Sequence, residues 1–377
     1  MTAEQLRKRA EKRKLIIQVA IVALSVLAVW GAVTSAQKNL AELGVTAGFA
    51  FLERGTGWSY SFALFPASID DTYARTLFIG FANTLFVGGI SIVLSTILGF
   101  LIGSIRDSSN LALSSAAFAF IQFFRNIPLI LQGIFWYSLL IHMPGPRQSY
   151  SMLDSIFLSN RGLMIPSLNI SVTQGVTLVI ASLAIMVFLI WKRFSLLKGI
   201  GIWLAATVAL AVFVSLVLSP ASEGMLSVPE LKGLRFVGGL EVSIELLTMI
   251  IAILFYSSAY IAEVVRGGLA EVPKGLIEAG QAVGLRPSTI WSQIKLPMAL
   301  RSIIPPLGNQ WIFVMKATTI GIAIGFSDLF MIVTTSITQS GQTLELIAIL
   351  AGAFLLVNFA IAQLVNLLNA RLKLKAH

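Results

Sequence analysis

The sequence contains no cysteine and only two histidines, His142 and His377, among its 377 residues. Without cysteine the chain can form neither a disulfide framework nor a thiolate metal site. Two histidines also argue against a metal centre that uses several imidazole ligands. We therefore expect this chain to bind no metal and no cofactor and to carry no catalytic residues.

Charged residues are also scarce, at 12% of the chain, whereas soluble domains carry about 25%. Hydrophobic residues make up 56% of the sequence. This composition predicts an all-α polytopic membrane protein. A phosphate-binding loop of the form G-x-x-x-x-G-K followed by Ser or Thr is absent, so any ATP-driven step requires an ATPase in a separate chain.

Apolar runs long enough to cross a membrane recur along the chain. They predict about eight spanning helices, near residues 15–36, 76–105, 113–141, 172–191, 199–219, 242–265, 304–326 and 344–368. A short external loop is expected between the last two. A cleaved signal peptide is the alternative interpretation of the first run, but its length of about 22 residues favours a retained span.

The positive charge is distributed by membrane side. Eight spans would place both termini on one side, and the segments on that side hold 18 of the 27 Lys and Arg residues. Cytoplasmic segments of membrane proteins are enriched in Lys and Arg. Both termini and the polar loop after the sixth span are therefore predicted to be cytoplasmic. The same distribution explains the net charge of +10 without a nucleic-acid partner.

That polar loop, from Pro273 to Pro297, predicts two short helices joined by a corner. Pro273 suits a first helical position, and Gly284 suits the left-handed residue just after a helix end. Pro287 is expected to open the second helix and Pro297 to end it. The apolar residues of the first helix fall at helical spacing: Leu276, Ile277, Gly280 and Val283. Such a face offers another protein a contact surface, and a simple cytosolic connector is the alternative.

The spacing of particular residues in this loop is specific. Three residues separate Glu278-Ala279-Gly280 from Gly284, and nine more precede Ile294-x-Leu296-Pro297. The pattern resembles the EAA loop of ABC importer permeases, which reads E-A-A, three residues, G, nine residues, I-x-L-P. Gly280 replaces the second alanine of the family pattern. This change of one small residue for another preserves helix packing at a modest cost in helix propensity.

The resemblance implies that the loop docks on a cytosolic ABC ATPase dimer and couples its motion to the pore. The residues implied in coupling are Glu278, Ala279, Gly280, Gly284, Leu285, Ile294, Leu296 and Pro297. A purely structural role is the alternative for Glu278, because an acid near a helix start favours the helix dipole. The resemblance also implies a bacterial inner (plasma) membrane location and a periplasmic amino-acid-binding protein as a partner.

Three further motifs resemble the polar amino-acid branch of this family: Tyr260–Gly268, Pro305–Gln310 and Phe124–Gln132. In the last, Asn126 and Ile127 replace the Gly and Thr usual in the family. The resemblance implies a type I importer core of five spans, divided between residues 76–142 and 243–377. Residues 1–75 add a basic N-terminus, a first span and an external segment, and residues 143–242 form an insertion with two extra spans. This long form resembles the longer permease subunit of general L-amino-acid and glutamate/glutamine importers, which implies pairing with a second permease subunit.

Polar residues inside predicted spans are candidates for the substrate pathway or its gate, because burial in a membrane is costly for them. These residues are Asn83, Arg125, Asn126, Gln132, Asn309, Gln310, Lys316, Thr318 and Thr319. Lys316 stands where the family commonly has K-D-T-S, so Ala317 removes an acid. Lys316 either holds a substrate carboxylate or is a buried structural lysine. Side chains such as Thr318 either line the path or bond to their own helix. Arg125 and Asn126 either shape a gate or serve packing. Interhelical hydrogen bonding is the alternative for Gln132, Asn309 and Gln310.

We therefore predict a permease subunit of an ABC importer that moves amino acids from periplasm to cytoplasm and performs no covalent chemistry. A self-contained secondary carrier is the alternative. It requires internal inverted repeats and broken helices with ion ligands at mid-membrane, and the sequence shows no convincing repeat. A membrane-embedded enzyme lacks support from any nucleophile–His pair, metal set or cofactor motif. Membrane lipid is an expected partner, and nucleic acid is not.

Overall fold

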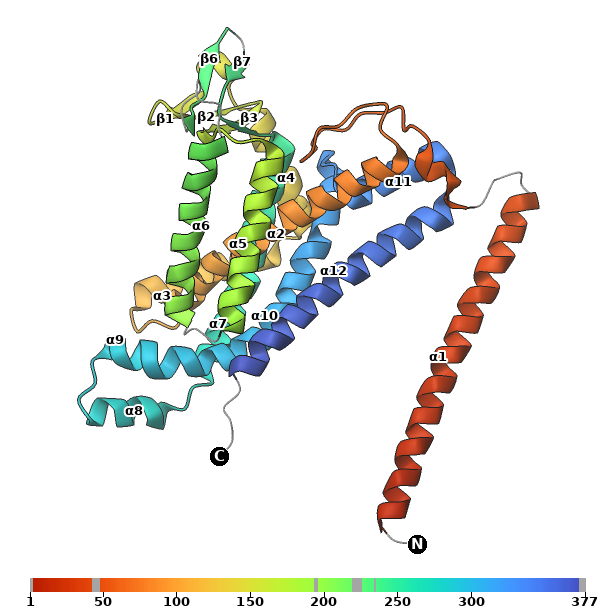
Figure 1. Cartoon of the computed structure of the whole chain (residues 1–377). Coiled ribbons are helices and arrows are strands. Elements are labelled where there is room, and N and C mark those ends of the chain that lie inside the picture. The colour runs from red at the N-terminus through yellow and green to blue at the C-terminus, as the bar shows by residue number, and fades with distance from the viewer. Residues whose placement is uncertain (1–2, 43–47, 193–195, 219–225, 234, 373–377) are drawn as a thin grey trace.

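The structure is a computed structural model, and it describes residues 3–42, 48–192, 196–218, 226–233 and 235–372. Helices dominate these residues, as the composition predicts (Figure 1). Three basic residues used in the charge-distribution argument lie outside the described residues: Arg193, Lys373 and Lys375.

Each of the eight predicted spans coincides with an apolar helix or a pair of helices. The continuous helices are α1 (Ala3–Glu42), α2 (Tyr73–Arg106), α5 (Val172–Trp191), α6 (Leu196–Leu218), α7 (Ile244–Ala270) and α12 (Thr343–Leu372). The third span corresponds to the pair α3 (Leu111–Asn126) and α4 (Leu129–Ile141), and the seventh to α10 (Leu296–Ala317) with the 3₁₀ segment that follows it. Helix α11 (Leu329–Ser340) lies beyond the seventh predicted span. By length and composition, four helices among the described residues can cross a membrane, or up to six if each bent pair is one span. The described parts of α5 and α6 are shorter apolar helices.

The third predicted span is not a single helix. The axes of α3 and α4 meet at 98°, so the kink predicted within 113–141 is a complete break between two helices. The cause lies in the sequence. Pro128 has no N–H to donate, and its ring restricts the preceding residue to extended backbone. Ile127 accordingly has φ −98° and ψ 123°, and the helix ends there.

The prediction of a short external loop before the last span was wrong, because most of that segment is helical. After α10 the chain forms a 3₁₀ segment, η4 (Thr318–Ile324), and turns at Gly325 with a φ of 74°. The Asp328 side chain then accepts a hydrogen bond from the Met331 N–H at 2.8 Å and caps the start of α11. This cap fixes the start of α11. The axis of α11 is bent by 52° from that of the preceding helix.

The predicted insertion contains strands that its sequence did not predict. An antiparallel sheet joins β1 (Tyr150–Met152), β2 (Ile156–Ser159), β3 (Gly162–Ile165) and β8 (Leu240–Val242) in that order. Two smaller pairs join β4 (Ser167–Leu168) to β5 (Leu226–Ser227), and β6 (Glu230–Lys232) to β7 (Arg235–Val237). The β3–β8 pairing brings the segment before α5 against the segment after α6. The strands therefore close the insertion at one end of α5 and α6 (Figure 1).

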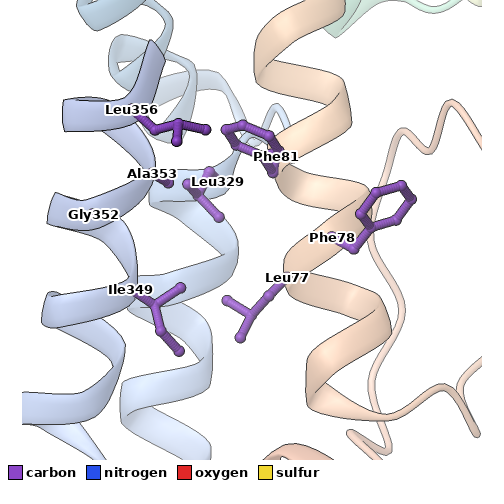
Figure 2. A pocket seen from close by; sticks show the side chains of 8 residues that line it. All are labelled: Leu77, Phe78, Phe81, Leu329, Ile349, Gly352, Ala353 and Leu356. Carbon is purple, nitrogen blue, oxygen red and sulfur yellow. The ribbon is translucent and has the colours of Figure 1, made fainter. Parts of the chain in front are cut away.

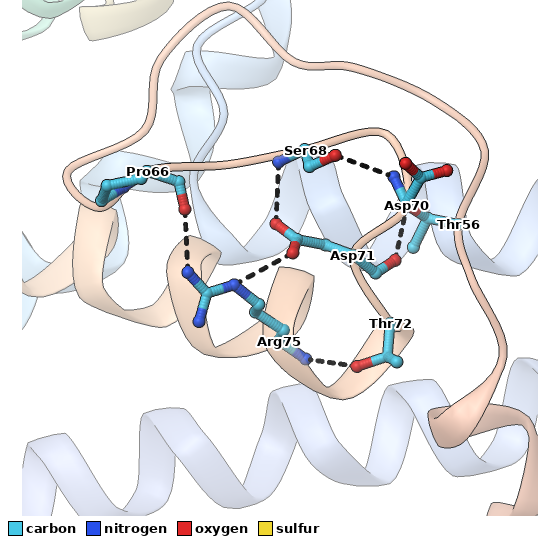
Figure 3. Close-up of polar contacts among 7 residues, drawn as sticks. All are labelled: Thr56, Pro66, Ser68, Asp70, Asp71, Thr72 and Arg75. Atoms are coloured by element: carbon cyan, nitrogen blue, oxygen red, sulfur yellow. Dashed lines mark hydrogen bonds and ion pairs between the residues drawn. The ribbon is translucent and has the colours of Figure 1, made fainter.

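The segment before α2 is held over the N-terminal end of that helix by a set of polar contacts (Figure 3). The Arg75 guanidinium donates to the Pro66 carbonyl oxygen at 2.9 Å and pairs with Asp71 Oδ1 at 3.0 Å. The second Asp71 carboxylate oxygen accepts from the Ser68 N–H at 2.9 Å, and the Asp71 carbonyl accepts from the Thr56 N–H at 2.9 Å. A 3₁₀ turn, η1 (Phe49–Glu53), precedes this segment. One arginine on α2 thus fixes the path of a long connection.

The core depends on the close approach of α2 and α7. Small residues recur every fourth position on the α2 face that meets α7: Ser95, Gly99 and Gly103. A Cβ on Gly99 would lie 2.7 Å from the Cβ of Ile261, and one on Gly103 would lie 2.5 Å from the Ala262 carbonyl oxygen. Neither position can hold a larger residue without separating the helices. Packing through small residues is the usual way in which membrane helices gain contact area.

We predict that Gly103→Ala destabilises the protein, because the added methyl group meets backbone rather than a flexible side chain. The expected loss in the free energy of unfolding is about 1–3 kcal/mol. Gly89→Ala is the matched control on the same helix, because a Cβ there meets nothing within 4 Å. Thermal unfolding of the two variants in detergent checks this, and equal midpoints would contradict the close contact.

Candidate functional site

The EAA-like loop folds as a helical hairpin with a fixed corner. Helix α8 (Lys274–Ala282) follows Pro273 and ends at Val283. Gly284 has a φ of 78°, in the left-handed region that its place in the sequence predicts. The Leu285 N–H donates to the Gly280 carbonyl at 3.0 Å, and the Gly284 N–H to the Gln281 carbonyl at 2.9 Å. These two bonds satisfy carbonyl groups at the end of α8 and define the corner.

The second arm of the hairpin continues into α10 without an interruption. Pro287 opens α9 (Pro287–Thr289) as predicted, and a π-helical turn, η3 (Ile290–Lys295), connects it to α10. The prediction that Pro297 ends this arm was wrong, because Pro297 lies in the first turn of α10. Proline is tolerated in a first helical turn, where its missing N–H has little effect, and the wider π turn precedes it.

The predicted apolar face of α8 divides into an inward and an outward part. On the inward side Gly280 is buried, and a Cβ there would lie 3.2 Å from Ile290 Cγ1 and from Ile294 Cδ1. On the outward side Leu276 is 42% exposed and Val283 is 75% exposed. Ala279 and Glu278 are also exposed. We call Leu276, Ala279 and Val283 the exposed stripe, since they follow one another at helical spacing on the outer surface of the hairpin.

One ion pair fixes the base of the hairpin to α2, and a second lies nearby within α7. Lys295 in the π turn pairs with Asp107, the residue that caps the end of α2. On α7, Arg266 pairs with Glu263 one turn earlier, with N–O distances of 3.0 and 2.5 Å. The remaining predicted coupling residues lie around this base: Leu285 is exposed at the corner, and Ile294, Leu296 and Pro297 are half-buried.

The break between α3 and α4 is bridged by a side chain. The Gln132 amide nitrogen donates to the Phe124 carbonyl at 2.9 Å and to the Ile127 carbonyl at 3.0 Å. Both carbonyls lie on the α3 side of the break. Beside it, the Arg125 guanidinium lies 5.0 Å from the centre of the Tyr260 ring on α7, and Asn126 is exposed. Gln132 therefore fixes the backbone that carries Arg125.

Asn83 lies at the other end of the bundle and joins two separate segments. Its amide nitrogen donates to the Phe62 carbonyl at 3.0 Å and to the Ser327 carbonyl at 2.7 Å, and its oxygen accepts from the Leu64 N–H at 3.0 Å. The side chain is completely buried. Asn83 thus holds the segment before α2 against the turn between η4 and α11.

The predicted polar residues of α10 and η4 differ in exposure. Asn309 and Lys316 are exposed in this chain, and Gln310 is half-buried. The Thr318 hydroxyl donates to the Met315 carbonyl at 3.0 Å, and the Thr319 hydroxyl to the Lys316 carbonyl at 2.8 Å. Both threonine hydroxyls therefore bond to their own helix, as such side chains commonly do.

The structure separates the candidate residues into three groups. One group forms the hairpin, a second surrounds the α3–α4 break and α10, and Asn83 belongs to the turn before α11. Sequence reasoning missed four residues that these groups contain: Tyr256, Tyr260, Phe313 and Asp328. The spacing of Tyr256 and Tyr260 by one helical turn was visible in the sequence, as was the position of Asp328 just before an apolar run.

A known protein family matches most of this chain. Residues 95–374 match the family described as binding-protein-dependent transport system inner membrane component. The chain belongs to this family. The match includes α3 to α12 and therefore covers the hairpin and the α3–α4 break. The protein is accordingly a multi-pass inner membrane component of a binding-protein-dependent transport system.

Individual relatives extend the match to nearly the full length. The chain is 35% identical to the general L-amino acid transport system permease protein AapQ of Rhizobium johnstonii, covering 96% of this chain and 92% of the relative. It is 37% identical to YhdX of Escherichia coli strain K12, covering 89% and 87%. It is 29% identical to the glutamate/glutamine/aspartate/asparagine transport system permease protein BztB of Rhodobacter capsulatus, covering 96% and 94%. These matches agree with the family resemblance of the sequence motifs.

This transport component also has an apolar hollow on its surface (Figure 2). The hollow has a volume of about 340 Å³ and lies between α2, α11 and α12. Its lining residues are Leu77, Phe78, Phe81, Leu329, Ile349, Gly352, Ala353 and Leu356. No polar side chain lines it, so the hollow suits a hydrocarbon chain and does not suit a charged substrate.

We predict that Gly284→Ala weakens the function of this transport component through the hairpin corner. A Cβ at a left-handed position costs about 1–2 kcal/mol, and the cost falls on the two bonds that end α8. Gly275→Ala is the matched control, because Gly275 lies within α8 and a Cβ there meets nothing within 4 Å. Substrate-stimulated ATPase activity of the complete transport system should fall in Gly284→Ala and be retained in Gly275→Ala. Equal activity in the two variants would mean that the corner is not needed.

Proposed function

We propose that this chain is the permease subunit of an ABC importer that carries amino acids from the periplasm to the cytoplasm. The family supports the importer, and the names of relatives such as AapQ and BztB support amino acids as the substrates. The observation that carries the proposal is the hairpin with its exposed stripe. An apolar stripe on a hairpin beyond the ends of the apolar helices needs a protein partner, because contiguous exposed apolar surface marks interaction sites.

The proposed partner of the stripe is a cytosolic ABC ATPase dimer. Leu276 and Val283 supply apolar contact area on the outer side of α8, and Glu278 lies between them in sequence. The inward packing of Gly280 on Ile290 and Ile294 makes the hairpin one body. A force on α8 therefore reaches α10 through the continuous helical path from Pro287 to Ile324.

A second permease subunit is proposed to cover the polar side of α10. Lys316 and Asn309 are exposed on this chain, yet their helix is one of the candidate spans. Contact between a lysine and hydrocarbon is costly, so this side must face protein or water. In contrast, α12 exposes Leu355, Leu356 and Phe359, each by 65% or more, and suits lipid. The exposed face of α10 thus supports pairing with a sibling subunit.

The remaining parts of the proposal concern orientation, lipid and the binding protein. The distribution of Lys and Arg supports cytoplasmic termini and a cytoplasmic hairpin. The strands of the insertion then lie on the periplasmic side, where a binding protein delivers the substrate. Membrane lipid surrounds α1, because none of the residues 16–35 in its apolar window is buried.

The structure contains one feature that secondary carriers also use, namely spans broken at membrane depth. Both bent pairs have this form, at 98° and 52°. Among the described residues, however, no group of three or more acidic or histidine side chains could hold a coupling ion. The hairpin has no role in a carrier that works alone. The importer therefore accounts for more of the structure.

The test of the proposal is a charge placed in the exposed stripe. Val283→Asp should abolish substrate-dependent ATPase stimulation and uptake in the reconstituted importer, because a carboxylate in an apolar contact loses its water. Gln281→Asp is the matched control, which adds the same charge to an exposed position on the other side of α8. Co-purification of the ATPase with each variant is measured in parallel. An ATPase that binds Val283→Asp as well as it binds Gln281→Asp would contradict docking through the stripe.

A further inference from the structure

Two cations at membrane depth form no salt bridge within the described part of the chain. Arg125 lies at the end of α3, and Lys316 lies in the last turn of α10. The salt bridges among the described residues involve other groups, such as Lys295 with Asp107 and Arg266 with Glu263. The Arg125 Nε atom is buried and has no hydrogen-bond acceptor. A cation in this setting needs an anionic ligand or water, since an unpaired charge is costly there.

A series of contacts leads from Arg125 to Phe313, which lies one helical turn before Lys316. Arg125 lies over the Tyr260 ring at 5.0 Å, and the Tyr260 ring lies 4.9 Å from the Tyr256 ring. Tyr256 in turn stacks on Phe313 at 5.7 Å, and Phe313 lies one turn before Lys316 on α10. We call Tyr256, Tyr260 and Phe313 the aromatic row.

The aromatic row also carries polar groups along its edge. The Tyr256 hydroxyl donates to the Tyr260 hydroxyl oxygen at 3.3 Å. Phe313 is 39% exposed, and Asn309 is exposed one turn away on the same helix. The row therefore lies at the surface of this chain that the sibling subunit is proposed to cover. It combines aromatic faces, hydroxyl groups and a cation at each end. The carboxylate of Glu263, one turn from Tyr260 on α7, attracts Arg125 but forms its ion pair with Arg266.

We propose that Arg125 and Lys316 are carboxylate-binding groups at the two ends of a translocation path along the aromatic row. This proposal rests on the proposed importer function and adds the part of the substrate that the path recognises. An amino acid always carries an α-carboxylate, which a guanidinium binds through two parallel hydrogen bonds. The row between the cations admits the apolar part of a side chain and excludes small free cations by charge.

The α3–α4 break gives Arg125 its position in this path. Gln132 holds the Phe124 and Ile127 carbonyls, so the backbone on both sides of Arg125 is fixed. The Phe124 ring also stacks on Phe255 at 5.0 Å. Gln132 is therefore a positioning residue for the arginine.

The absence of cysteine makes a direct test possible, because an introduced cysteine is the only one in this chain. Asn126→Cys lies beside Arg125, and Asn309→Cys lies one turn from Phe313 on the exposed side of α10. Each is placed in the assembled importer. It is then treated with methanethiosulfonate reagents of equal size that carry either a sulfonate or a trimethylammonium group. The reaction rate is read on this chain after separation of the subunits by gel electrophoresis.

The sulfonate reagent is expected to react at least about tenfold faster than the cationic reagent at both positions, relative to their rates with a free thiol. Arg125→Gln should reduce this preference at Asn126→Cys, and Lys316→Gln should reduce it at Asn309→Cys. Arg125→Lys should retain it, because the charge remains. Leu153→Cys is the control for bulk effects. It is 85% exposed on the insertion, and neither substitution should change its rate ratio.

Several outcomes would overturn the proposal. One is equal reactivity toward the two reagents at both positions. Another is a preference that Arg125→Gln and Lys316→Gln leave unchanged, or that Arg125→Lys loses as fully as Arg125→Gln. Where Arg125→Gln prevents assembly, the Arg125→Lys and Lys316→Gln measurements decide. ATPase stimulation by the binding protein is measured on the same samples. Normal stimulation without a reagent preference refutes the path alone, whereas absent stimulation in the unsubstituted protein refutes the importer.

Discussion

A helix that breaks inside a membrane exposes backbone groups that water cannot satisfy, and this constraint organises the structure. At the α3–α4 break, Gln132 supplies hydrogen bonds to two carbonyls. At the turn before α11, Asn83 donates to the Ser327 carbonyl and the Thr84 hydroxyl accepts from the Leu329 N–H at 2.9 Å. Asp328 caps the helix that follows. At each break a particular side chain therefore lies close enough to form hydrogen bonds with the exposed backbone groups.

These hydrogen bonds explain the central position of α2. Asn83 and Thr84 on α2 hold the turn before α11, and Asp107 at its end holds Lys295 in the hairpin. Between them, Gly99 and Gly103 bring α7 into close contact. One helix thus anchors the hairpin, the neighbouring core helix and the distant turn. Small residues in its middle and polar residues near its ends serve these separate requirements.

The sequence allowed the long apolar helices and the hairpin corner to be predicted, because each depends on local information. The bounds of α5 follow from its apolar run. The corner at Gly284 follows from a glycine placed directly after apolar residues at helical spacing. The 98° break did not follow, since Pro128 alone is compatible with anything from a kink to a complete break. Gln132, four residues after Pro128 in the sequence, bonds back across the break in the folded chain, and this contact is not visible in the sequence.

Other features were missed because they depend on contacts between distant segments. The strands are two to four residues long, too short to show a period of two, and β3 pairs with β8 across the whole insertion. The division of the α8 face also requires the fold. Ile277 and Val283 look alike in the sequence, but the packing of the hairpin leaves Ile277 half-buried and Val283 exposed. The aromatic row similarly needs α7 and α10 to meet, and its contact with Arg125 needs α3 beside them.

The anchoring of α10 restricts how the proposed importer can open. Its start is tied to α2 through Lys295 and Asp107, and its far end is followed by a turn that Asn83 ties to α2. A force on α8 that preserves both ties moves α10 and α2 together. The close contact at Gly103 then carries α7 with them. We therefore expect opening to occur between this body and its partner subunit, along the surface that presents Lys316 and the aromatic row, and not between helices of the subunit itself.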